Sequence, residues 1–136
     1  MTKPVILCVD DEKVVLHSLR TQLKEAFGDA YIYELAEDAD EALEVINELN
    51  EEDISIILIV SDWLMPGMKG DEFLIHVHQQ FPNIIKVMLT GQADEVAIER
   101  AKEQANLHCC LFKPWSEEEL VEALKSGLAK LWPNNR

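Results

Sequence analysis

Cysteine is scarce in this sequence, and its placement gives no disulfide framework. The three cysteines are Cys8, inside an apolar run, and the adjacent pair Cys109 and Cys110. Adjacent cysteines are poorly placed to bridge each other, and small secreted domains use an even, spaced set. A chain of 136 residues can bury roughly two thirds of the surface that its unfolded form exposes, so it needs no such staples. We therefore predict a reducing, cytoplasmic environment.

Long hydrophobic runs are also missing. The N-terminal stretch MTKPVILCVDDE contains a short apolar run that breaks on acids, whereas a secretory signal has a longer apolar core. No apolar stretch approaches the roughly 20 residues that cross a bilayer as a helix. The sequence therefore predicts no signal peptide, no membrane span and no membrane partner.

Basic residues are also scarce in this sequence. Lysine and arginine number 12 against 26 acids, which gives a net charge of −14. A surface this negative repels phosphate backbones and anionic lipid, so we predict no direct binding of nucleic acid by this chain. Most of the acids, as in residues 37–44, fit solvated helix faces, and only a few are placed for chemistry.

Apolar runs of strand length alternate with longer stretches of helical period. Three of the runs are nearly continuous in Val, Ile and Leu, as strands covered on both faces are. Five helical stretches lie between and after them, and the fourth is alanine-rich, which predicts light packing. The pattern predicts an α/β fold with a central parallel sheet and helices on both faces. The predicted strands are residues 4–9, 31–35, 54–61, 84–90 and 108–112.

Helix ends carry recognisable capping residues. Gly28 is predicted to follow the first helix, since glycine is the common residue after a helix end. Asp38 with Glu41 resembles a capping box for the second helix, and Ser116 with Glu119 one for the fifth.

Polar residues stand at the C-terminal ends of four predicted strands. In an open parallel sheet, sites form at this edge, where the strand order reverses. We therefore expect acids, a hydroxyl and a lysine to converge there. The residues are Asp10, Asp11 and Glu12 after the first strand, Asp62 at the third, Thr90 and Gly91 at the fourth, and Lys113 and Pro114 after the fifth.

Carboxylates that cluster repel each other, by about 4 kcal/mol for two charges 4 Å apart at an effective dielectric near 20, and the protein must offset this repulsion. Raised pKa values, a neighbouring ammonium and a divalent cation can each supply it, and a set of oxygen ligands favours Mg²⁺ over zinc. With a cation present, a carboxylate can attack a phosphoryl donor. Asp62 is the candidate nucleophile, and the loop with Pro66 and Gly67 is expected to leave the Leu64 carbonyl facing the ion.

Four motifs resemble, in order, those of the receiver domain of two-component response regulators. They are ILCVDDE, SDWLMPGMKG as the Asp-x-x-Met-Pro-x-x-x-Gly pattern, LTGQAD and FKPW. The resemblance covers nearly the whole chain and implies one receiver domain over residues 1–136, with any output domain outside it. It also implies a flavodoxin-like, doubly wound sheet of five parallel strands in the order 2-1-3-4-5, with five helices on both faces.

The resemblance assigns roles to individual residues. Asp62 would be the phosphoacceptor, and Asp11 would bind Mg²⁺ directly together with Asp62 and the Leu64 carbonyl. Asp10 would contact the ion largely through water.

Lys113 would pair with Asp62 before reaction and with a phosphoryl oxygen afterwards, and its bond to Pro114 is expected to be cis. Thr90 would donate its hydroxyl to the phosphoryl group.

The implied function is a phosphorylation-dependent switch that hydrolyses its own phosphoryl group slowly and is otherwise not an enzyme. The donor would be a sensor histidine kinase or a histidine phosphotransfer protein. The face of the fourth helix, fifth strand and fifth helix would then control an output domain or partner, and the chain could form a homodimer there. One departure is Cys110, where the family usually carries Tyr or Phe, so we expect other side chains to transmit the change.

Competing interpretations remain at this point. The fold would also suit a partner-binding receiver that is never phosphorylated, or an aspartate-nucleophile phosphohydrolase, although the latter generally carries an acid where this chain has Leu64. A flavin-binding module is disfavoured because the VDDEK loop would repel phosphate. Asp10 and Asp11 could instead cap the first helix.

The four histidines show no metal-ligand spacing, so structural or surface roles are expected for His17, His76, His78 and His108.

Overall fold

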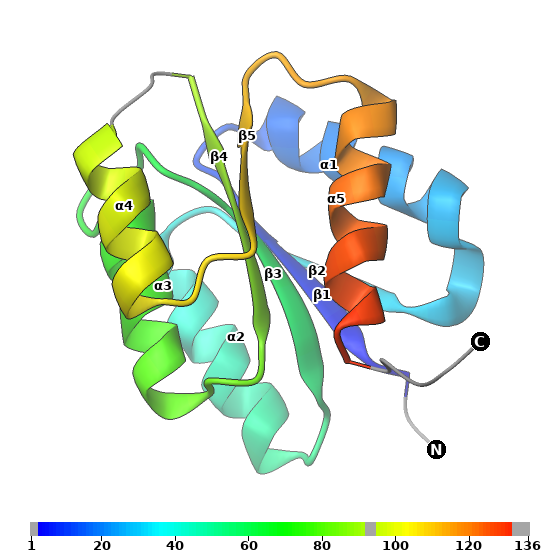
Figure 1. The fold of residues 1–136 in the computed structure, drawn as a ribbon. Helices are drawn as coiled ribbons and strands as arrows, with labels where there is room; N and C mark the ends of the chain where they lie inside the picture. The colour runs from blue at the N-terminus through cyan, green and yellow to red at the C-terminus, as the bar shows by residue number, and fades with distance from the viewer. Residues whose placement is uncertain (1–2, 92–94, 132–136) are drawn as a thin grey trace.

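A parallel sheet of five strands forms the centre of the molecule (Figure 1). The computed structural model describes residues 3–91 and 95–131. The strand order is β2-β1-β3-β4-β5, and every neighbouring pair is parallel, which confirms the predicted topology. The strands are β1 (Val5–Val9), β2 (Ile32–Ala36), β3 (Ile56–Asp62), β4 (Ile85–Thr90) and β5 (Cys109–Phe112).

Helices cover both faces of this sheet, as predicted. In Figure 1, α1 and α5 lie on one side, and α2, α3 and α4 lie on the other. A short 3-10 turn, η1 (Gly28–Ala30), follows the first helix. The helices are α1 (Lys13–Phe27), α2 (Ala39–Glu51), α3 (Gly70–Gln80), α4 (Glu95–Gln104) and α5 (Glu117–Ala129).

Two apolar layers hold the sheet between the helices. Alternate residues of a strand point to opposite faces, so Ile6 and Cys8 pack toward α1 and α5, while Leu7 and Val9 pack toward α2 and α3. All five residues of β1 are completely buried. This double burial accounts for the continuous apolar runs in the sequence.

The α4 helix packs lightly, as its alanine content predicts. Its buried residues are Ala97 and Ala101, and Val96 on its outer side is 79 % exposed. Small side chains bury little apolar area and therefore stabilise a helix position weakly.

One of the two predicted capping boxes is complete. Ser116 accepts from the Glu119 amide at 3.0 Å, and the Glu119 carboxylate accepts from the Ser116 amide at 2.9 Å. The prediction of a capping box at Asp38 is only partly confirmed. Asp38 accepts a hydrogen bond from the Glu41 amide, but the Glu41 carboxylate accepts from the Glu37 amide and not from the Asp38 amide. The Glu37 amide, one residue before the N-cap Asp38, donates to Oε1 of Glu41 at 2.6 Å.

The first helix ends as predicted at Gly28, whose φ of 61° favours glycine and whose amide donates to the Lys24 carbonyl. Cys8, Cys109 and Cys110 are free thiols. Within residues 3–91 and 95–131, none of the helices is both long and apolar enough to cross a membrane.

Candidate functional site

Three carboxylates meet at the C-terminal edge of the sheet. Asp10 follows β1 and Asp62 ends β3, and these strands are paired, with Val9 opposite Ser61. One carboxylate oxygen from each of Asp10, Asp11 and Asp62 lies within 4.8 Å of the others. Asp10 and Asp62 are buried, with exposures of 0 % and 4 %, whereas Asp11 faces solvent. The structure therefore confirms the prediction that these three acids converge.

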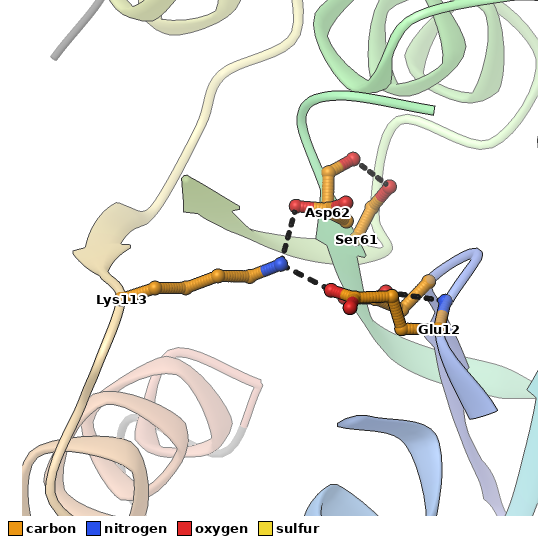
Figure 2. A network of polar contacts seen from close by, with 5 residues as sticks. Glu12, Ser61, Asp62 and Lys113 are labelled. Carbon is orange, nitrogen blue, oxygen red and sulfur yellow. Dashed lines mark hydrogen bonds and ion pairs between the residues drawn. The ribbon is translucent and has the colours of Figure 1, made fainter. Parts of the chain in front are cut away.

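Lys113 reaches the same carboxylates from the end of β5. Its Nζ lies 3.0 Å from Oδ1 of Asp62 and 3.2 Å from Oδ2 of Asp10. Figure 2 shows the Lys113 side chain pointing toward Asp62. The Lys113 amide donates to the Thr90 carbonyl at 2.8 Å, which fixes the start of the side chain, and the bond to Pro114 is cis as expected. One ammonium thus contacts two of the three clustered carboxylates, and this group of side chains keeps an excess of negative charge.

The pKa values of the buried acids reflect this excess. Burial raises the pKa of Asp62, the hydrogen bond from Lys113 opposes the rise, and the charge of Asp10 adds to it. Burial likewise raises the pKa of Asp10, against the opposing hydrogen bond from the Glu12 amide and the charge of Lys113. For Lys113 itself, burial lowers the pKa, but the combined attraction of Asp62 and Asp10 outweighs burial and leaves the pKa raised. The lysine is therefore an ammonium ion at neutral pH.

The alternative interpretation, that Asp10 and Asp11 cap the first helix, is confirmed in part for Asp10. Oδ1 of Asp10 accepts a hydrogen bond from the Glu12 amide at 2.9 Å, just ahead of α1. Glu12 itself is the N-cap residue, and its side chain makes no capping hydrogen bond. Asp10 therefore uses one oxygen near the helix start and the other for Lys113, so capping and membership of the acidic cluster coexist.

The remaining predicted residues lie at the same edge. Thr90 ends β4, is 2 % exposed, and directly follows Leu89, which pairs with Asp62 in the sheet. An open hollow at the surface is lined by Asp62, Leu64 and Lys113, together with Asp11 and Gly91. Leu64 is 53 % exposed at this hollow.

The loop from β3 to α3 is held tightly behind Asp62. The Trp63 amide donates to the Leu89 carbonyl, and the Gly70 amide donates to the Trp63 carbonyl, both at 2.7 Å. A Cβ at Gly70 would lie 2.8 Å from the Trp63 Cα and would overlap the Asp62 carbonyl oxygen, so glycine is required there. Gly67 has a φ of 78°, which also favours glycine. The loop therefore fixes the backbone at both sides of Trp63.

Sequence reasoning missed a third buried carboxylate, which lies beside this loop. Asp71, in the first turn of α3, is 1 % exposed and accepts a hydrogen bond from Nε1 of Trp63 at 3.1 Å. Arg100 of α4 donates to the other Asp71 oxygen through Nε at 3.0 Å and forms an ion pair with it through Nη2. In the sequence, Asp71 looks like any acid in a first helical turn, so no signal distinguished it.

Comparison with known families agrees with this geometry. The model of the response regulator receiver domain matches residues 6–125, which is most of the chain. The chain belongs to the receiver domain family. It is therefore a signalling domain of the two-component type.

Individual relatives agree with the assignment. This receiver domain is 30 % identical over 123 residues to the hydrogenase transcriptional regulatory protein HoxA of Cupriavidus necator, a match that covers 90 % of the chain and 24 % of the relative. The chain thus spans about a quarter of that relative's length.

Solved structures are also similar. The signal receiver domain of an HD domain-containing protein from Pseudomonas fluorescens Pf-5 superposes with a TM-score of 0.85 at 30 % identity, covering 98 % of this chain and 100 % of the other. A CheY-like receiver domain from Methanospirillum hungatei JF-1 gives 0.83 at 28 % identity, with the same coverage of 98 % and 100 %.

Proposed function

We propose that this receiver domain is a switch that accepts a phosphoryl group on Asp62 from a phosphohistidine of a sensor histidine kinase or a histidine phosphotransfer protein. The observation that carries the proposal is the position of the Asp62 carboxylate, which lies 3.0 Å from the Lys113 ammonium and lines an open hollow. Residues 1–136 act as one such domain in the cytoplasm.

Mg²⁺ is the proposed cofactor, because the donor set fits it. The clustered ligands are carboxylate oxygens with excess negative charge, and burial raises the pKa of both Asp10 and Asp62, so the site favours a hard cation. Asp11, Asp62 and the Leu64 carbonyl would hold the ion directly, and Asp10 would act largely through water. Bound there, Mg²⁺ supplies neutralisation of the charge on the phosphoryl oxygens.

The transfer uses the chain's own groups in defined roles. A carboxylate oxygen of Asp62 forms a bond to phosphorus while the bond from phosphorus to the donor imidazole nitrogen breaks, and its electron pair stays on the imidazole. Lys113 shifts from Oδ1 of Asp62 to a phosphoryl oxygen, and the Thr90 hydroxyl donates to another. Water later cleaves the acyl phosphate slowly and regenerates the Asp62 carboxylate.

Phosphorylation would act on α4, β5 and α5 through the end of β4. Thr90 drawn toward the phosphoryl group shifts the end of β4, and α4, whose packing on alanines is light, responds to that shift. Moving a two-state equilibrium from 1:99 to 99:1 takes about 5.5 kcal/mol. A few charge-assisted hydrogen bonds, each worth about 1.5–3 kcal/mol, are of that order. The altered face then controls an output domain or partner, and offers a surface for a homodimer.

Fluorescence of Trp63, the residue after Asp62, tests the proposal. Addition of Mg²⁺ and then of beryllofluoride, a phosphoryl mimic, is expected to change the emission in two saturable steps. Asp62→Ala should weaken the Mg²⁺ step, because it removes a proposed ligand of the ion, and should abolish the beryllofluoride step. Trp63→Phe should remove both changes while Trp115 and Trp132 still emit. If Asp62→Ala responds as the parent does, the assignment of Asp62 as the phosphoacceptor is wrong.

A further inference from the structure

A buried carboxylate joins the loop behind Asp62 to α4. One oxygen of Asp71 accepts from the indole of Trp63, and its other oxygen accepts from the guanidinium of Arg100. We call these three residues the Asp71 bridge. It links the residue next to Asp62, the start of α3 and the middle of α4.

The Trp63 end of the bridge is tied to the loop behind Asp62. The backbone of Trp63 is held by the Leu89 carbonyl on one side and the Gly70 amide on the other, so the indole follows any shift of the loop. Asp71 is 1 % exposed, so little water can replace a partner that it loses. An unpaired buried acceptor is costly, and a displacement of Trp63 is therefore passed to the carboxylate and on to Arg100.

On the α4 side, Arg100 is well placed to pass on such a displacement. The helix otherwise buries Ala97 and Ala101, and small side chains resist sliding weakly. The side chain of Arg100 contacts Asp71, yet it is 45 % exposed and lines a surface hollow with Glu99 and Glu103. A partner on α4 would sense a change in its position.

We propose that Trp63, Asp71 and Arg100 are positioning residues that carry the phosphorylation state of Asp62 to α4. This inference rests on the proposed function and deepens it. In β5, the half-buried Cys110 has no ring with which to report the state. The bridge therefore gives a shift of the loop behind Asp62 a second route to α4, beside the one through Thr90.

Hydrogen exchange of α4 amides, measured with acetyl phosphate and Mg²⁺, tests the bridge. Intact-mass analysis of the same samples gives the fraction of molecules phosphorylated. In the parent, phosphorylation should change the exchange rates of residues 95–104 by roughly fivefold or more. In Arg100→Met and in Trp63→Phe, phosphorylation should match the parent, but the exchange response should fall below about twofold.

Three further variants distinguish the contact between Arg100 and Asp71 from a general effect of positive charge on α4. Lys102→Met removes the same charge from the same helix and breaks only the exposed contact of Lys102 with Glu99 at 3.8 Å, so it should respond as the parent does. Arg100→Lys keeps the charge without the two-nitrogen contact and should restore part of the response. Asp71→Asn keeps an acceptor for the indole but loses the ion pair, and should behave like Arg100→Met.

The outcomes separate the bridge from the proposed function. A full α4 response in Arg100→Met at equal phosphorylation overturns the bridge and leaves the phosphoacceptor assignment standing. A parent that gains no phosphoryl mass overturns the proposed function and the bridge with it. Loss of the response in Lys102→Met as well would assign the effect to helix charge and also overturn the bridge.

Discussion

A buried lysine lies at one end of the sheet and a half-buried lysine at the other, and the two differ in what surrounds the ammonium. Lys113, at the C-terminal edge, contacts the carboxylates of Asp62 and Asp10. Lys86, near the start of β4, is 1 % exposed, and its Nζ contacts neutral groups, the Ile84 carbonyl at 2.8 Å and Nδ1 of His78 at 2.9 Å. The same side chain is thus placed in a charged site at one end and in a neutral one at the other.

The pKa values of the two lysines show the consequence. Burial lowers the pKa of Lys86 from 10.5 to about 8, because none of its described hydrogen-bond partners carries a negative charge. At Lys113, burial also lowers the pKa, but Asp62 and Asp10 more than offset it. Lys113 therefore keeps its charge up to a higher pH than Lys86 does, because carboxylates share its site.

The largest expected effect is a pH dependence of stability at Lys86. Between pH 8 and 10.5 the unfolded lysine binds a proton that the folded one has lost, so stability should rise with pH across this window. The full gain is about 3 kcal/mol, since one pKa unit corresponds to about 1.4 kcal/mol. Lys86→Met should lack this term, which urea unfolding at several pH values would measure as a difference from the parent.

At neutral pH, the comparison of the two lysines also predicts that Lys86→Met stabilises the protein. There Lys86 is charged and its burial cost is fully present, so Lys86→Met should raise the free energy of unfolding by about 1 kcal/mol after the loss of its hydrogen bonds. A parent whose stability relative to Lys86→Met stays flat from pH 8 to 10.5 would show that the ammonium is not desolvated.

The next largest effect, with the opposite sign, is expected at Lys113. Lys113→Met leaves the Asp62 and Asp10 carboxylates without their cation and should lower the free energy of unfolding at pH 7 by about 2 kcal/mol. This is below the about 3–5 kcal/mol of fully buried pairs because the lysine side chain is 22 % exposed. Urea unfolding with and without Mg²⁺ checks it, and Mg²⁺ should shrink the loss. A loss that Mg²⁺ leaves unchanged would contradict the proposed ion site.

The smallest effect is expected at Asp62. Its raised pKa means that the folded carboxyl binds a proton more tightly than the unfolded one, so stability is lost as pH rises from 3.8 through the folded pKa. Asp62→Asn should therefore stabilise the protein by about 1 kcal/mol at pH 7, as substitutions at functional sites often do. The gain should vanish toward pH 3.8, and thermal unfolding at both ends of the range tests this. A destabilised Asp62→Asn protein at pH 7 would contradict the excess of negative charge.

The C-terminal edge could be predicted from the sequence because its residues are tied to strand ends. Asp10, Asp62, Thr90 and Lys113 each end or follow a strand, and the ends of parallel strands meet at one edge. Polar residues at the strand ends therefore predicted contacts between side chains that lie far apart in the sequence. The cis bond before Pro114 came from the resemblance and is present.

The Asp71 bridge and the site of Lys86 could not be predicted in this way. Asp71 and Arg100 lie 29 positions apart, and their contact depends on how α3 and α4 pack, which no local pattern encodes. Lys86 falls inside an apolar run, yet its full burial depends on the carbonyl of Ile84 and the ring of His78. The expected structural role of His78 agrees with this contact, although its partner was not foreseen.

Phosphorylation of the purified chain by acetyl phosphate, mapped by tandem mass spectrometry with and without Mg²⁺, tests the central claim most directly. The account predicts one modified residue, Asp62, with labelling that requires Mg²⁺ and is lost in Asp62→Ala. Labelling at another residue, or no labelling of folded protein in Mg²⁺, would contradict it.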